Sequence, residues 1–321
     1  MTSVRTRLTE LLGIDHPVML AGMGGVSYHE LVTAVTEAGG FGCMGASTMS
    51  FDRMCAEMAL VAAATDRPWG VDLLTALPGS MVEQAEAIIA AGAQLFVAGL
   101  GIPREVIDLC HGRGVLVASM CGKVHHATAA VAAGCDLVIA QGTEAGGHTG
   151  TIATMALVPQ VVDAVDGAVP VVAAGGIVDG RGLAAARALG ADGVWVGTRF
   201  IATPEAWGTP GYKERLVAMT ADDTVVSRAY SGKTCRVVRN AYTQQFEEHP
   251  ERLQPFPQQL LVSMEDGANH LGAGPDTEVD PEREFWPAGQ GAGSITDLMP
   301  AGEIVVSMVD EAERILAGLS G

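Results

Sequence analysis

LVIAQGTEAGGHTG, residues 137–150, joins an apolar run directly to a glycine-dense loop that holds one histidine, His148. The run 137–140 has the length and composition of a buried strand. Glycines in the loop that follows let bare backbone amides approach a ligand. Two later apolar runs, 170–174 and 193–196, also end in glycine. We therefore expect several strand ends to meet at one site.

The chain around this segment repeats one pattern, in which an alanine-rich stretch with helical spacing is followed by a glycine and a short apolar run. Glycine just past a helix end supplies the left-handed conformation that turns the chain into the next strand. The expected strands begin near residues 17, 41, 69, 95, 115, 137, 170 and 194. Eight strands at helix-length intervals predict an α/β fold, a closed parallel (β/α)8 TIM barrel.

A doubly wound parallel sheet is the alternative, but no glycine cluster completes its G-x-G-x-x-G turn. The repeated pattern stops after residue 203, where proline and charged residues gather. We therefore predict a barrel made of residues 1–203 and 291–321, with a closing helix at 303–316. Residues 204–290 are predicted to form an inserted, smaller segment that covers the substrate.

Composition narrows the classes of partner. The 321 residues are 48% hydrophobic and carry a formal charge of −18, which disfavours nucleic acid and anionic membranes as partners. The 6 cysteines show neither C-x-x-C pairs nor zinc-finger spacing, so we expect reduced thiols, no metal site and a cytoplasmic location. No signal peptide or membrane-spanning stretch is visible.

Ligands of parallel barrels bind at the carboxyl ends of the strands. The last two strand ends often hold a phosphate, because loop amides and a helix N-terminus attract an anion. Gly175 and Gly176 at the seventh end, and Gly197 and Thr198 at the eighth, suit that task. The other interpretation is that these glycines only form turns. The neighbouring Arg199 could add charge or form a surface ion pair.

His148 is the candidate catalytic base, because an imidazole titrates near neutral pH and can remove an acidic proton. A lone histidine is more often structural, but the glycines before this one favour a functional role. His125 and His126 are expected at a helix start, as a cap or on a solvated face. His249 and His270 could line a substrate pocket.

Residues 17–203 resemble the FMN-binding barrel of the nitronate monooxygenase family, formerly called 2-nitropropane dioxygenases, and of the related flavin-dependent enoyl reductases. The resemblance is carried by blocks at 17–23, 140–150, 170–182 and 193–200. The motif GQGAG at 289–293 resembles the family's late motif that returns to the flavin. The resemblance therefore covers nearly the whole chain.

This resemblance implies a bound FMN, with its phosphate on the glycines of the last two strand ends and its ring against residues 21–24. Gln141 would hydrogen-bond the ring. Family members often carry asparagine where this chain has Asp72, so Asp72 is protonated, is neutralised by Lys123, or points elsewhere. The implied cofactor-binding residues are Ala21, Gly22, Met23, Gly24, Asp72, Lys123, Gln141, Gly146, Gly147, Gly175, Gly176, Val196, Gly197, Thr198, Gln290 and Gly291.

The activity that the resemblance implies is oxidation of nitronates, or of nitroalkanes that His148 has deprotonated, by O2 to a carbonyl compound and nitrite. An NAD(P)H-dependent flavin reductase acting on a quinone, an enoyl thioester or a CoA-linked ketone remains open. A flavin-free phosphate-binding barrel is a third alternative. The expected partners are a small-molecule substrate and O2, with NAD(P)H as co-substrate of the reductase; a homo-oligomer remains open.

Overall fold

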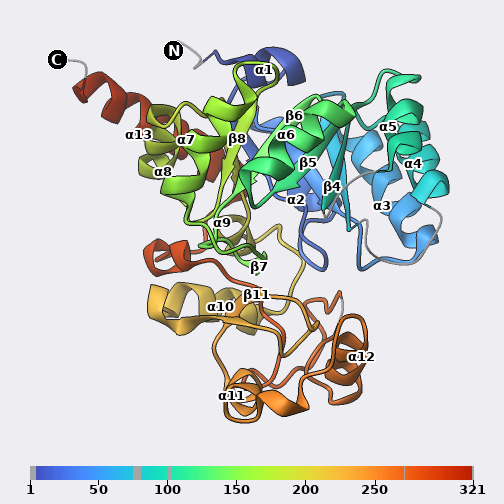
Figure 1. The fold of residues 1–321 in the computed structure, drawn as a ribbon, viewed down its shortest axis with the longest axis vertical. Helices are drawn as coiled ribbons and strands as arrows, with labels where there is room; N and C mark the ends of the chain where they lie inside the picture. Colours follow the sequence, from blue (N-terminus) through green and yellow to red (C-terminus); the bar gives the residue numbers. More distant parts are fainter. Residues whose placement is uncertain (1–4, 75–80, 100–102, 271, 320–321) are drawn as a thin grey trace.

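A computed structural model describes residues 5–74, 81–99, 103–270 and 272–319. Eight parallel strands form one sheet in the order β1-β9-β8-β6-β5-β4-β3-β2 (Figure 1). The sheet closes between its first and last strands, because Leu20 N donates to Phe41 O and Phe41 N donates to Val18 O, both at 2.9 Å. The predicted TIM barrel is confirmed. Its strands are β1 (Val18–Leu20), β2 (Gly42–Gly45), β3 (Trp69–Leu74), β4 (Leu95–Gly99), β5 (Leu116–Cys121), β6 (Leu137–Gln141), β8 (Val171–Ala174) and β9 (Gly193–Val196).

Helices surround the barrel and one of them closes its base. Helix α1 (Arg7–Leu12) places Leu8 among the interior residues of the barrel, where Met19 and Trp195 also lie. The absence of a side chain at Gly193 leaves room for Leu8, since a Cβ at residue 193 would lie 2.4 Å from Leu8 Cδ2. The opposite end, where the strands finish, is left for a ligand. The outer helices are α2 (His29–Glu37), α3 (Phe51–Ala64), α4 (Met81–Ala90), α5 (Arg104–His111), α6 (Val124–Ala133), α7 (Thr154–Val165), α8 (Gly180–Ala188) and α9 (Thr198–Ile201).

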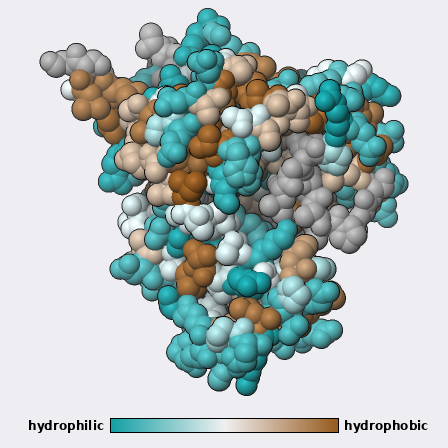
Figure 2. Space-filling model, viewed as in Figure 1, coloured by the Kyte–Doolittle hydropathy of each residue, from teal (hydrophilic) through white to brown (hydrophobic). Residues whose placement is uncertain are grey.

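The segment 204–290 lies beyond the carboxyl ends of the strands, below the barrel in Figure 1. It has a core of its own around Tyr230 and Tyr242. On the face shown in Figure 2 its surface is mainly hydrophilic. Its elements are α10 (Pro210–Ala218), η1 (Ala221–Asp223), β10 (Thr224–Ser227), β11 (Cys235–Val238), α11 (Ala241–Glu248), η2 (Pro250–Arg252) and α12 (Gln258–Glu265).

A second sheet ties this segment to the barrel, which the sequence did not lead us to expect. Its order is β10-β11-β7, and β7 (Gly147–His148) belongs to the glycine-dense loop after β6. The strands β11 and β7 are antiparallel, with Cys235 opposite His148. The candidate base therefore lies on an edge strand of the sheet that segment 204–290 builds.

The chain ends by returning to the barrel. The turn η3 (Gln290–Ser294) contacts α9 and α10, and α13 (Ala301–Leu319) packs on α8 and α2. Close packing against α8 depends on Gly180, where a Cβ would lie 2.5 Å from Glu311 Cβ. The division between 1–203 with 291–321 and 204–290 stays a prediction. In the described part of the chain, no helix is both long and apolar enough to cross a membrane.

Candidate functional site

A cavity of about 1040 Å³ lies at the carboxyl ends of the barrel strands and extends along segment 204–290. Its volume is in the range of small-molecule and cofactor sites. The predicted site residues that line it are Ala21, Gly22, Met23, Gly24, Asp72, Lys123, Gln141, Gly146, Gly147, His148, Gly175, Gly176, Gly197, Thr198 and Gly291. Most of the predicted site is therefore brought together around one cavity.

Two predicted residues, Val196 and Gln290, are not among the described residues that line the cavity. Val196 is buried, and its carbonyl accepts a hydrogen bond of 2.8 Å from Ala21 N. The backbone N of Gln290 donates to Glu144 O at 2.9 Å. Both residues hold neighbouring chain segments in place beside the cavity rather than forming its wall.

The seventh and eighth strand ends form a backbone cradle. Gly175 and Gly176 have φ values of +106° and +74°, which strongly favour glycine. The late motif, residues 289–293, packs against these glycines, since a Cβ at Gly291 would lie 3.0 Å from Gly176 O. Gly289 N donates to Thr198 Oγ1 at 3.0 Å. The structure thus joins three segments that are distant in sequence.

Arg199 does not contribute to this cradle. Its side chain is buried and pairs with Asp297, at 2.7 Å between Nη2 and Oδ1. Nη1 also donates to the carbonyl of Asp297 at 3.0 Å. The ion-pair interpretation of Arg199 fits the structure, although the arginine end of the pair is buried rather than on the surface.

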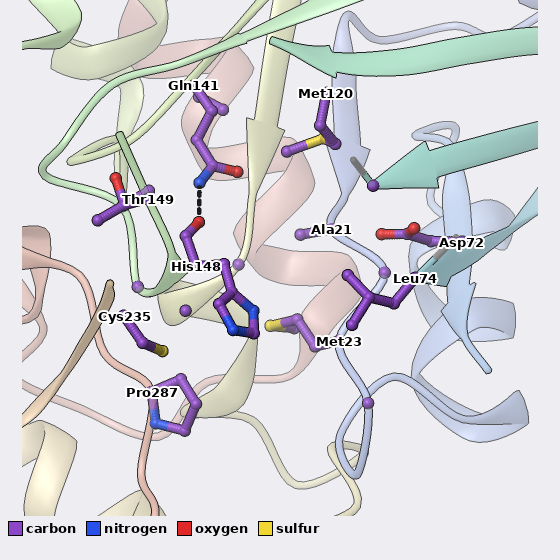
Figure 3. Close-up of a pocket in the computed structure, with 18 of the residues that line it drawn as sticks. Ala21, Met23, Asp72, Leu74, Met120, Gln141, His148, Thr149, Cys235 and Pro287 are labelled. Carbon is purple, nitrogen blue, oxygen red and sulfur yellow. Dashed lines mark hydrogen bonds between the residues drawn. The ribbon is translucent and has the colours of Figure 1, made fainter. Parts of the chain in front are cut away.

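His148 is held from both sides of the cavity. From the barrel, Gln141 Nε2 donates to the His148 carbonyl at 2.6 Å (Figure 3). From segment 204–290, Ser231 Oγ lies 3.0 Å from His148 Nε2. The ring faces Met23 across the cavity in Figure 3. The side-chain NH2 group of Gln141, a residue expected to hydrogen-bond the flavin ring, donates one hydrogen to the histidine loop, and its second hydrogen and its Oε1 are not used by this bond.

The environment of His148 favours the neutral imidazole. Burial lowers the pKa of its side chain, and the nearby Lys233 ammonium lowers this pKa further. Lys233 lines the same cavity, with its Nζ 4.3 Å from the centre of the Phe256 ring. A neutral imidazole at physiological pH retains the lone pair that a general base needs.

Asp72 lies within β3, two residues before the strand ends, and in Figure 3 its carboxyl points toward Ala21 rather than away from the cavity. Burial raises the pKa of Asp72 to about 8. Within the described residues its carboxyl forms neither a hydrogen bond nor an ion pair, and Lys123 begins α6 without pairing with it. Of the three interpretations, this geometry favours a protonated Asp72.

Glu144 anchors the loop that carries His148. Its carboxylate accepts hydrogen bonds from Thr154 N and Oγ1, both at 2.9 Å, at the start of α7. A carboxylate at a helix N-terminus is favourable because it satisfies free amides and the helix dipole. Glu144 is therefore a fixed part of the loop.

Several residues of segment 204–290 complete the cavity. Tyr212 and Trp286 are stacked with ring centres 5.5 Å apart, and both line it. His270 also lines it and pairs with Glu284 at 2.6 Å. His125 and His126 lie in the first turn of α6 and are exposed, as expected for a solvated face, and His126 also reaches the cavity wall. His249 lies elsewhere, beside Glu251. Tyr230 and Tyr242 belong to the core of segment 204–290.

Sequence reasoning missed Ser231 and Lys233. Their approach to His148 depends on the pairing of β11 with β7, across 83 residues for the Ser231 contact. Neither residue stands in a motif, and register between distant strands leaves no local signal. A histidine at the tip of a loop could still have prompted a search for a hydrogen-bonding partner.

Comparisons with known proteins agree with this geometry. FabK from Thermotoga maritima is 34% identical to this chain, with 99% of each chain covered and a TM-score of 0.90. Nitroalkane oxidase from Streptomyces ansochromogenes is 30% identical, with 98% of this chain and 100% of that chain covered and a TM-score of 0.82. A Mycobacterium tuberculosis protein, (3aS,4S,5R,7aS)-5-hydroxy-7a-methyl-1-oxo-octahydro-1H-indene-4-carboxyl-CoA dehydrogenase, is 40% identical over 76% of this chain and 69% of its own length.

The family model described as Nitronate monooxygenase matches residues 5–311, which is nearly the whole chain. The match spans the barrel, the segment with Ser231 and the late motif. The fold and the histidine-bearing cavity are those that the resemblance implied. This chain therefore belongs to the nitronate monooxygenase family and is an oxidoreductase.

Proposed function

We propose that this protein uses FMN and O2 to oxidise nitronates, and nitroalkanes after deprotonation, to a carbonyl compound and nitrite. The observation that carries the proposal is the position of His148, a neutral and anchored imidazole on the wall of the cavity that the glycine cradle also borders. A substrate between them would present an acidic carbon to the base. The family match and the likeness to a nitroalkane oxidase support the same chemistry.

The residues present fit FMN. Gly175, Gly176, Gly197 and Thr198 would hold its phosphate, because they line the cavity at the last two strand ends, where the positive φ values of Gly175 and Gly176 set the course of the backbone. Residues 21–24 would lie along the ring. When bound, FMN would supply the redox chemistry of the oxidation.

The hydrogen bonds around His148 indicate which of its nitrogens acts as the base. Ser231 Oγ can donate to Lys233 O at 3.4 Å, and it then accepts the proton of His148 Nε2 at 3.0 Å. A neutral imidazole protonated on Nε2 has its lone pair on Nδ1. We assign the general base to Nδ1, with Ser231 as a positioning residue.

The test is a visible spectrum combined with oxygen uptake. The purified protein should show flavin absorbance, and a preformed nitronate should cause oxygen uptake without any nicotinamide. Release of a flavin other than FMN on denaturation would contradict the cofactor assignment. If neither a nitronate nor a nitroalkane drives oxygen uptake, the proposed reaction is wrong.

A second candidate, an NAD(P)H-dependent flavin reductase, is favoured by the extent of the cavity. The cavity continues past His148 to Leu260 and His270 in segment 204–290, which leaves space for a large substrate. The relative that is a CoA dehydrogenase acts on a bulky thioester. Anaerobic addition of NADH or NADPH separates the candidates, because rapid loss of flavin colour supports the reductase.

A further inference from the structure

Asp72 is a partly buried acid on the cavity wall, and its position is fixed by tight packing. Its backbone carbonyl accepts a hydrogen bond of 3.1 Å from Ala46 N, and it lies opposite Gly45 in the β2–β3 ladder. A Cβ at Gly22 would lie 2.2 Å from Asp72 Cβ, so the chain after β1 passes directly against this side chain. The carboxyl is therefore held on the cavity wall.

Among the residues that the structure describes, no basic group pairs with this carboxyl. Cys43 on β2 is the titratable residue beside it, and burial together with Asp72 raises the pKa of that thiol. On β4 the opposing residue is the apolar Val97. Lys123, His126 and His148 line the same cavity, but none of them is paired with Asp72 in the described structure. An isolated buried carboxylate is costly, whereas the neutral acid is much less so.

We propose that Asp72 is a neutral carboxylic acid that donates its O–H as a hydrogen bond to bound FMN. This inference rests on the proposed function, because it requires the flavin in this cavity. A neutral acid offers a donor to the acceptor atoms of a flavin ring. An ionised carboxylate would instead repel the negative charge that the reduced ring carries. The raised pKa of Asp72, about 8, is consistent with the neutral form at pH 7.

The proposal makes FMN binding dependent on pH. If FMN binds the protonated form, its Kd stays constant near pH 7 and rises above the pKa of Asp72, approaching tenfold for each further pH unit. Fluorescence titration of the apoprotein with FMN from pH 7 to 9.5 measures this. Asp72→Asn keeps a neutral donor at every pH, so its Kd should follow only the titration of FMN itself.

The matched control is Glu284→Gln, which replaces the other carboxylate among the described cavity residues. This variant should keep the wild-type rise in Kd. A wild-type Kd that does not rise more steeply than that of Asp72→Asn overturns the assignment of Asp72, with the proposed function intact. Failure of the wild-type protein to bind FMN at any pH overturns both proposals.

A second measurement needs no cofactor. The neutral form is favoured in the folded state, so wild-type stability should fall relative to Asp72→Asn as pH rises from about 4, the ordinary pKa, towards about 8. Above that range the difference should be constant. Denaturant unfolding of both apoproteins measures it, and a difference that does not change with pH would overturn the neutral acid.

Discussion

The two halves of the cavity are built in different ways. The half formed by β8 and β9 presents backbone, with glycines such as Gly175 that combine a positive φ with close packing against neighbouring chain segments. The half formed by segment 204–290 presents side chains such as Ser231 and Lys233, which act on His148 from a distant part of the sequence. The comparison suggests that cofactor binding depends on local chain geometry. The position and pKa of the catalytic base depend instead on the pairing of strands that are distant in sequence.

The largest expected effect is on turnover, and it comes from replacing the histidine that segment 204–290 holds in place. His148→Ala should lower turnover of a neutral nitroalkane by about 10²- to 10⁴-fold, the usual contribution of a general base. FMN content and turnover of a preformed nitronate should be retained, because a nitronate needs no deprotonation. Steady-state oxygen uptake with both substrates measures this. His270→Ala is the matched control, and an equal loss in that variant would contradict the specific role of His148.

The second largest effect is expected from a substitution in the half of the cavity formed by β8 and β9. In Gly175→Val, the new Cβ would lie 2.8 Å from Thr154 Oγ1 and 3.0 Å from Gly142 O, at a φ that valine rarely adopts. We expect FMN affinity to fall by at least about 100-fold, equivalent to roughly 3 kcal/mol. Gly114→Ala is the control, since its φ is also positive but open space surrounds it. Equal FMN affinity in both variants would contradict a cradle at Gly175.

A smaller effect is expected where the two halves meet. Ser231→Ala removes the partner of His148 Nε2, and one hydrogen bond contributes about 0.5–1.5 kcal/mol, or up to roughly tenfold in rate. kcat for the nitroalkane should fall while FMN affinity is unchanged. Ser231→Thr keeps the hydroxyl and should restore activity. If Ser231→Ala lowers FMN affinity instead, the serine supports the fold rather than the base.

The smallest expected effect is a shift in the pH dependence of kcat/KM. Lys233→Met removes a positive charge that lowers the pKa of His148, so this pKa should rise in the variant. The base is active when deprotonated, and the acidic limb of the kcat/KM profile for a nitroalkane should therefore move to higher pH. Burial, the larger cause, remains. A limb that moves to lower pH would show that Lys233 acts on another group.

The eight strands could be predicted because each carries its own apolar run and most also follow a glycine at the end of the preceding helix. The glycine cradle followed from the same local pattern. Val196 and Gln290 do not line the cavity, because a motif marks a segment, whereas the side of the chain that faces the cavity depends on packing. The protonation of Asp72 depends on burial, which the sequence alone does not give.

Strand β7 belongs to a loop of the barrel and also pairs with β11 of segment 204–290, and this arrangement affects how a substrate can enter. Segment 204–290 holds His148 through strand pairing and through the contact with Ser231. If this segment swings away to admit a substrate, it must either carry the imidazole with it or break both attachments. In either case the open enzyme has no aligned base, so proton abstraction is confined to the closed arrangement.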